Sequence, residues 1–559
     1  MFLAVALSLA VLVVWNFLFP PKPPQRAPAR QEAVRESPAP APLETGAPAP
    51  ATPGALATPG ASGGGAARPL VQAAAEERVT LEAPGLRAVF TNRGAQLVSL
   101  EHTTSSGQTL DLVRKRQQPP YPYGLVGSGL QPDPLNGALF AAEPSGDGRS
   151  VLFRYSGPLG AAEKRFGFDE QGLLQVEARV PGRRDWGLLL GPGVRNPTEE
   201  ELESQFEMRG AVIRSGDEVT VLDAKGAEEG TALNGEGLRW VGVEDTFFLA
   251  AAIPLEGLGS VSLQPVLVRT PAGGAGGAAF APLPPKDQLT DEQEDLPREY
   301  AVVLRPEGDR LSLLSYWGAK EQDRLAALPY GLEEAIQWGT LGILARPLLA
   351  GLRWIYENVV ANYGWAIILM TLLIKILTLP LTHSSMVSMK KMQALNPKMQ
   401  AIRERYRPKL RDKQGKPNME MQRKMNEEVM ALYRSEGVNP AGGCLPLLIQ
   451  MPILFAFYRM LTVAAELRGA PWLGWIQDLS IHDPYYVLPI VMGATQFLQV
   501  KLGPQAPDPM QRRLFLFMPV FMTFFFLGFP SGLVLYWLTN NVLTIVQQSV
   551  YNHLRKREQ

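Results

Sequence analysis

The stretch Trp365–Thr382, WAIILMTLLIKILTLPLT, decides the fold class of this chain. It is apolar apart from Lys375 and three threonines. Its length is close to the ~20 residues that an α-helix needs to cross a bilayer, so it predicts a membrane-spanning helix. Lys375 lies 10 residues into the stretch. At ~1.5 Å per residue that is about 15 Å, which is near the middle of a membrane.

The polar residues of this stretch share one helical face. Thr371, Lys375, Thr378 and Thr382 are spaced at i−4, i, i+3 and i+7. A charge at the centre of a membrane helix costs roughly 2.5–3.5 kcal/mol on insertion scales, so such residues face a bundle interior or a wet cavity. The alternative is a lysine that is paired with a polar partner for packing alone.

Other apolar stretches predict a bundle of helices around this one. Four more spans are expected at Cys444–Val463, Tyr485–Val500, Leu514–Phe529 and Gly532–Gln547. Residues 1–19 add an N-terminal anchor, for which a cleaved signal peptide is the alternative. No basic residue precedes the apolar run and no small-residue cleavage site follows it, which favours the anchor. The chain therefore predicts six spans.

Two further spans also carry polar side chains. Tyr536, Asn540, Thr544 and Gln547 fall at i, i+4, i+8 and i+11, and Asn541 and Gln548 widen this face. Gln450 lies in the span that ends at Val463. Amides of this kind also hold membrane helices together. Together with the Lys375 face, they predict a shared hydrophilic compartment.

The charged residues predict an orientation. The loop 383–442 carries 13 Lys and Arg against six Asp and Glu, and the tail ends Arg555-Lys556-Arg557. Basic loops stay in the cytoplasm. Alternating spans then place both termini inside and the long region 76–318 outside. Lys22, Arg26 and Arg30 follow the anchor on the outside and oppose this arrangement, although long domains translocate despite local charge.

The remaining regions differ in composition. Residues 20–75 are rich in Pro, Ala and Gly and predict a tether. Residues 76–318 contain many short β-rich runs between Gly and Pro turns, as in Leu86–Phe90 and Val151–Tyr155, and predict an antiparallel sandwich. Residues 319–362 include an amphipathic stretch that is expected to lie at the outer membrane surface or to form a packed elbow.

The basic loop 383–442 predicts a helical hairpin that is rich in methionine. Its candidate contacts for apolar segments include Met389, Met392, Met399 and Met425, because flexible thioethers suit varied partners. Ordinary packing between the two helices is the alternative. The positive charge suits anionic lipid headgroups or ribosomal RNA, or serves only to set the orientation.

Some classes of function are disfavoured by composition. The chain has one cysteine and four histidines that lie far apart in sequence, so no metal site is predicted. No catalytic residue and no cofactor site is predicted either, because the polar faces supply neither a nucleophile nor an acid–base pair.

Several motifs together resemble a known family, the YidC membrane protein insertases. They are Asn362–Trp365 leading into the Lys375 span, Val438–Ile453 (VNPAGGCLPLLIQMPI), Asp483–Ile490 (DPYYVLPI), Asp508–Met510 and Phe529–Tyr536 (FPSGLVLY). The resemblance covers about residues 331–557. The anchor, tether and β-region match the arrangement of the Gram-negative form of the family.

The resemblance implies a fold and a function. It implies a polytopic helical membrane bundle, with a five-helix insertase core at 363–559, and a periplasmic all-β supersandwich related to sugar-binding folds. The hydrophilic groove of this core opens to cytoplasm and lipid, and Lys375 stands where the family usually has arginine. Nascent membrane proteins, the Sec translocon, the ribosome and membrane lipids are the implied partners, and the cell inner membrane is the implied location.

Two other functions stay open from the sequence. One is a small-molecule membrane transporter, which the lack of a pair of Gly- or Pro-broken repeat helices disfavours. The other is a mutarotase-like outer enzyme on a membrane anchor, which the few histidines disfavour.

Overall fold

The computed structural model describes residues 70–558 except for nine short internal segments. These are 105–106, 117–118, 199–200, 202–207, 270–278, 295, 412–417, 439–444 and 504–508. The predicted anchor 1–19, most of the predicted tether and Cys444 therefore lie outside the described residues.

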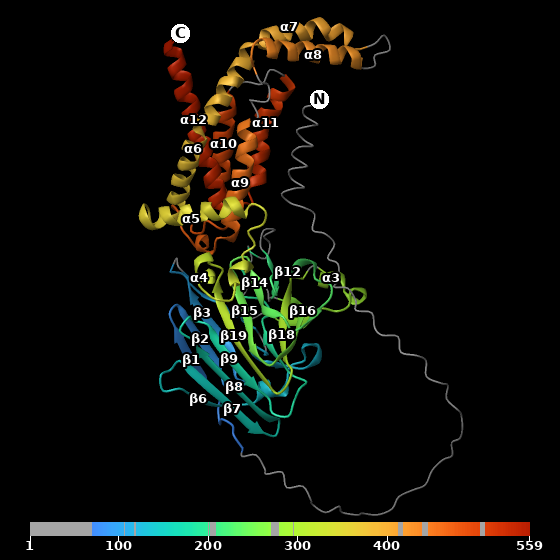
Figure 1. Cartoon of the computed structure of the whole chain (residues 1–559), viewed down its shortest axis with the longest axis vertical. Coiled ribbons are helices and arrows are strands. Elements are labelled where there is room, and N and C mark those ends of the chain that lie inside the picture. Colours follow the sequence, from blue (N-terminus) through green and yellow to red (C-terminus); the bar gives the residue numbers. More distant parts are fainter. Residues whose placement is uncertain are drawn as a thin grey trace, which may run out of the picture. The chain divides into compact units, whose positions relative to one another are not determined.

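The first part of the described chain is a β-structure of three antiparallel sheets (Figure 1). One sheet has the order β1-β2-β3-β4, a second has β13-β16-β18-β10-β5 with β17 beside β16, and the third has β12-β11-β14-β15-β19-β9-β8-β7-β6. The strands are β1 (Arg78–Ala83), β2 (Leu86–Thr91), β3 (Gln96–Thr103), β4 (Thr109–Asp111), β5 (Leu125–Val126), β6 (Ala141–Pro144), β7 (Ser150–Gly157), β8 (Gly160–Phe168), β9 (Leu174–Arg179), β10 (Gly187–Leu190), β11 (Arg209–Ser215), β12 (Glu218–Asp223), β13 (Thr231–Asn234), β14 (Leu238–Asp245), β15 (Phe248–Glu256), β16 (Leu258–Arg269), β17 (Ala279–Pro282), β18 (Arg298–Pro306) and β19 (Arg310–Ala319). The predicted all-β class is confirmed.

Strand β8 shows why these sequences fold as sheet. Its side chains alternate along the strand, so that Ala162, Lys164, Phe166 and Phe168 are buried and their neighbours are not. The buried Lys164 is satisfied because its ammonium donates to the backbone carbonyls of Gly94, Ala95 and Tyr123 at 2.7, 3.2 and 2.7 Å. An unpaired cation at this place would be strongly destabilising.

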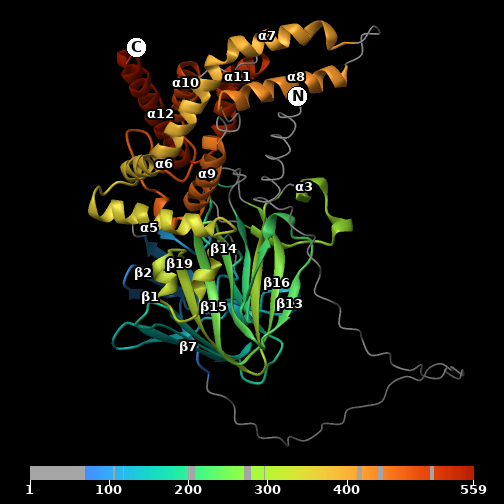
Figure 2. The same cartoon turned by 45° about the horizontal axis from the view of Figure 1, so that its top comes forward.

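The second part of the described chain is helical. Its main elements are α5 (Gly342–Asn358), α6 (Tyr363–Ala394), α7 (Asn396–Tyr406), α8 (Met419–Ser435), α9 (Leu445–Val463), α10 (Val487–Leu502), α11 (Pro509–Phe526) and α12 (Ser531–Glu558), with the short α3 (Asp291–Glu294) and α4 (Gln322–Ala326) before them. Helices α7 and α8 lie side by side as a hairpin (Figure 1; Figure 2). Helix α6 runs unbroken through Pro380 into the region predicted as a separate hairpin helix, so the span and the hairpin share one helix.

One helix within the described ranges, α6, is long and apolar enough to cross a membrane, and α10 is a shorter apolar helix. The count of six spans therefore stays a prediction. Apolar side chains are nevertheless exposed on several helices, such as Leu377 on α6 (78%) and Phe524 on α11 (71%). Contiguous apolar surface of this kind marks contact with lipid or with another protein.

The loop after α9 is held against the β-structure by buried charges. The guanidinium of Arg468 pairs with the carboxylate of Glu201 and lies over the rings of Phe247 and Phe248, with its central carbon 5.5 and 5.7 Å from their centroids. Glu201 also pairs with Arg195 at 2.6 Å. Burial alone would raise the pKa of Glu201, but Arg195 and Arg468 outweigh it and lower that pKa to about 2.

We expect Arg468→Met to lower the unfolding free energy by about 1–3 kcal/mol, because it removes one partner of a buried carboxylate. The matched control is Arg310→Met, which removes the exposed pair with Glu177 at 3.6 Å and is expected to cost ~0–1 kcal/mol. Thermal unfolding of the full chain in detergent measures both.

The pH dependence follows from the lowered pKa of Glu201. Its contribution is fully present above ~4.3, the pKa of an unfolded glutamate, and is lost as the pH falls towards 2. The difference between wild type and Arg468→Met should therefore persist from pH 7 to about pH 4. Equal unfolding temperatures for wild type and Arg468→Met at pH 7 would contradict this account.

Candidate functional site

The predicted polar face of α6 meets a polar face of α12. The ammonium of Lys375 donates to Thr544 Oγ1 at 2.7 Å and to Asn540 Oδ1 at 3.3 Å. An ammonium has three N–H donors. The third N–H of Lys375 has no acceptor in the part of the chain that the structure describes.

The threonines of this face bond mainly to their own helix. Thr371 and Thr378 donate to the carbonyls of Ile367 and Ile374 at 2.7 and 2.9 Å, and Thr382 donates to that of Thr378 at 3.1 Å. Their hydroxyls can still accept hydrogen bonds. Thr382 does so from Gln547 Nε2 at 3.1 Å, whereas Thr371 is buried.

The face of α12 links α6 to α9. Gln450 Nε2 of α9 donates to the hydroxyl of Tyr536 at 2.5 Å, and the Tyr536 ring stacks on Phe457 with centroids 4.3 Å apart. Along α12, Tyr536 therefore contacts α9, and the later residues Asn540, Thr544 and Gln547 contact α6. The structure brings together seven of the nine predicted groove residues in these contacts and leaves Thr371 and Thr378 bonded within α6.

Two residues predicted to widen this face lie elsewhere. Asn541 Nδ2 donates to the carbonyl of Met492 at 3.2 Å and to Thr495 Oγ1 at 3.4 Å, both on α10. Gln548 also lies beside α10, at Gly503. The prediction was wrong because spacing along one helix does not reveal which neighbour each side chain meets.

The methionines of the hairpin differ in exposure. Met399 is buried in a cluster with Leu395, Tyr433 and Val438, and accepts a hydrogen bond from the Tyr433 hydroxyl. Met392 packs on the same cluster, and Met389 and Met425 are half-buried. Met419 and Met430, which are 58% and 41% exposed, present more surface to a partner. For Met399 the structure shows the packing role that the sequence left open.

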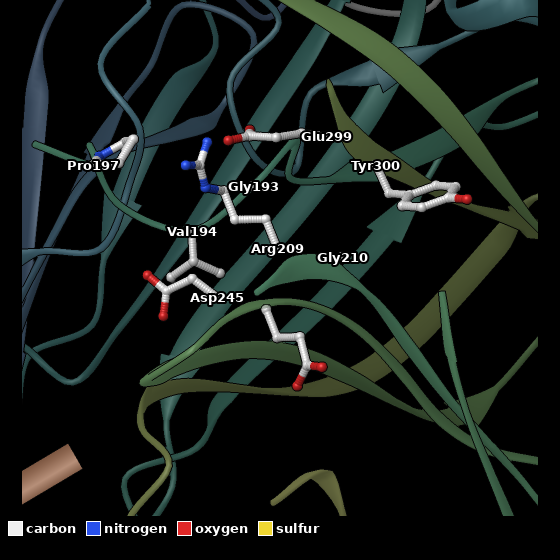
Figure 3. Close-up of a pocket in the computed structure, with 9 residues that line it drawn as sticks. Gly193, Val194, Pro197, Arg209, Gly210, Asp245, Glu299 and Tyr300 are labelled. Atoms are coloured by element: carbon white, nitrogen blue, oxygen red, sulfur yellow. The ribbon is translucent and has the colours of Figure 1, made fainter. Parts of the chain in front are cut away.

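Sequence reasoning missed a pocket in the β-structure (Figure 3). Its lining includes Gly193, Arg209, Glu244, Asp245, Glu299 and Tyr300. The acidic groups are paired, Glu244 with Lys320 at 3.3 Å, Asp245 with Arg195 at 2.6 Å and Glu299 with Arg114. Burial raises the pKa of Glu244, although Lys320 opposes this. The sequence gives no motif for this pocket, because its lining residues come from separate strands and loops.

These observations define a class of protein: a helical bundle with a lysine-centred polar interior, joined to a β-sandwich domain. Two family profiles match the chain, one over the β-domain and one over the helical bundle. The profile described as "YidC periplasmic domain" matches residues 78–350, and the one described as "60Kd inner membrane protein" matches residues 354–558.

The chain belongs to the YidC family of membrane protein insertases. The protein described as membrane protein insertase YidC of Geobacter metallireducens is 35% identical over 571 residues, which cover 98% of this chain and 97% of that protein. Its counterpart in Syntrophus aciditrophicus is 34% identical and covers 98% of both chains. That of Aromatoleum aromaticum is 46% identical over 248 residues, which cover 44% of this chain and 43% of that one.

Solved structures give a weaker comparison. A crystal structure of an active YidC insertase with its first transmembrane domain resolved is 18% identical, covers 86% of this chain and 94% of that chain, and has a TM-score of 0.35. A GalM/aldose epimerase homologue from C. elegans is 14% identical, covers 44% of this chain and 99% of that chain, and has a TM-score of 0.26.

The family settles the general function. The chain is a membrane protein with a β-rich periplasmic-type domain and a helical insertase region, and its function is membrane protein insertion. Its substrates are accordingly nascent membrane proteins. The relatives are named as insertases, not as enzymes.

Proposed function

We propose that Lys375 and the α12 face form the groove through which a polar segment of the client enters the membrane. The observation that carries this is the third N–H of Lys375, which has no acceptor among the described residues while the other two hold Thr544 and Asn540. An acidic side chain of the client supplies the missing acceptor. The sequence places no Asp or Glu within the five predicted apolar spans of the bundle to compete for it.

The physical task of an insertase is to carry a polar segment across hydrocarbon. A hydrated groove that reaches the level of Lys375 shortens the apolar path and lowers that barrier. Attraction between unit charges 4 Å apart is about 4 kcal/mol at an effective dielectric constant of ~20. The apolar segment of the client then moves sideways into lipid, driven by the hydrophobic effect.

The basic hairpin supports a topology in the cell inner membrane. Loop 383–442 and both termini lie in the cytoplasm and the β-domain lies in the periplasm, since basic loops are retained inside. In this orientation the free end of the α7–α8 hairpin is available to the ribosome, and exposed Met419 and Met430 are available to a nascent chain. The Sec translocon and membrane lipids complete the proposed partners.

A small-molecule transporter receives no support from the comparisons. The described β-domain pocket does not favour the mutarotase-like alternative, because its lining contains paired charges and no histidine.

The charge of Lys375 is expected to matter more than its shape. Lys375→Arg should retain insertion, whereas Lys375→Ala should slow insertion of clients with acidic translocated tails at least roughly tenfold, because losing ~1.4 kcal/mol, about a third of the full attraction, already has that rate effect. Lys375→Glu should be worse, because like charges repel. Protease protection of the tail, in cells carrying only the variant, measures the effect.

Two controls accompany this series. A client with a neutral tail should be affected less by all three variants, and Lys398→Ala, which removes an exposed cation paired with Glu436, should leave both clients unaffected. Equal insertion of the acidic-tailed client by wild type and Lys375→Glu at equal protein levels would refute the electrostatic role.

The exposure of the hairpin methionines gives a second test. A photocrosslinking residue at Met430 should capture a stalled nascent membrane protein, because this position is exposed. The same residue at buried Met399 should crosslink only within the hairpin. If Met430 yields only lipid or intrachain products, the hairpin does not bind nascent chains.

A further inference from the structure

A second set of polar side chains lies between α10 and α12, away from Lys375. It consists of Thr495, Gln496 and Gln499 on α10 and Asn541 and Gln548 on α12, and is called the α10–α12 seam here. Gln496 and Gln499 lie four residues after Met492 and Thr495, so helical spacing places them on the side of α10 that meets Asn541. Asn541 follows Asn540 by one residue, so it points about 100° around α12 from the Lys375 face. The seam is therefore distinct from the groove proposed above.

The two helices meet at two matching levels. Asn541 bonds to Met492 and Thr495 of α10. Seven residues further along α12, Gln548 lies against Gly503 at the end of α10. A Cβ atom added to Gly503 would be 3.3 Å from Gln548 Nε2, and also 3.1 Å from the backbone oxygen of Gln499 in the same helix. The helices thus run in the same direction, and the seam extends along both to the end of α10.

Three side-chain oxygens of the seam lack hydrogen-bond donors among the described residues. The side-chain carbonyl oxygens of Gln496, Gln499 and Gln548 are buried, and none has a donor in the ranges that the structure covers. Gln548 is 9% exposed as a residue and Asn541 is 2% exposed. Rotating an amide does not solve the problem, because its NH₂ group would then need acceptors at the same place.

The simplest alternative is that these amides hold the helices together. Helix-joining amides bond across the interface, but only Asn541 does so here among the described seam residues. Lipid tails offer no donors, and unsatisfied polar groups at membrane depth are strongly disfavoured. Donors must therefore come from water or from polar groups that pass through.

We propose that the α10–α12 seam is a second water-filled branch of the insertase interior, open at the cytoplasmic end of α10 beside Gly503. The side of entry rests on the topology of the proposed function. The seam offers amides and a hydroxyl, with no charge from Lys375, so it receives uncharged hydrogen-bonding segments of a client. Helix α12 then separates an acidic-tail route on one face from a neutral polar route on the other.

Cysteine labelling tests the proposal on the full chain in inside-out membrane vesicles. With Cys444→Ser as the background, Gln496→Cys and Gln548→Cys are treated with a charged, membrane-impermeant methanethiosulfonate. Only a thiol in water forms the reactive thiolate. Both should label at least about tenfold faster than Leu498→Cys and Val546→Cys, whose parent side chains are 44% and 53% exposed on apolar surface.

The groove has its own readout in the same experiment, Gln547→Cys, which faces Thr382. Slow labelling at Gln496 and Gln548 with fast labelling at Gln547 overturns the seam and leaves the groove. Fast labelling at Gln496 and Gln548 with slow labelling at Gln547 supports the seam and rejects the groove, and slow labelling at all three rejects both. If either seam variant fails to accumulate in the membrane, Gln499→Cys replaces it.

Discussion

The arrangement of the helical region depends on how a lysine is accommodated inside a bundle of apolar helices. Its ammonium needs acceptors, and the bundle supplies them as neutral oxygens on α12 at 2.7 and 3.3 Å. This requires α12 to lie against α6 with its polar face inward. The same face also meets α9 through Tyr536 and Gln450, so one polar face of α12 joins α6 and α9.

The end of the bundle where α12 begins is held by backbone and ionic contacts. The carboxylate of Asp483 accepts hydrogen bonds from Trp475 Nε1 and from the backbone N–H groups of Tyr485 and Leu488 at 2.7–3.0 Å. The N–H of Ser531, where α12 begins, donates to the carbonyl of Ile481 at 2.7 Å. Because Arg468 ties the same loop to the β-domain, that domain is connected to α12 through one ordered segment.

Periodicity in the sequence predicted the polar faces of single helices, but not the contacts between helices. It gave the Lys375 face and the Tyr536–Gln547 face, because each is a property of one helix. It misplaced Asn541 and Gln548, since their partners are on α10 and no pattern within α12 points there. The burial of Met399 and the pairing of Arg468 with Glu201 also join residues that are distant in sequence, so they required the structure. The division into a β-region and a helical region was accessible from composition alone.

The resemblance implies arginine at the position of Lys375, and a lysine there is consistent with this geometry. Arginine carries five donors in a fixed planar fork, which suits paired binding of a carboxylate. Lysine is a compact charge with three donors that rotate, and here two of them bond to neutral oxygens that do not cancel the charge. In the proposed function, the remaining donor and the uncancelled charge let Lys375 attract an acidic group from any approach, without a defined orientation. Recognition of this kind suits clients whose polar tails share charge but no common shape.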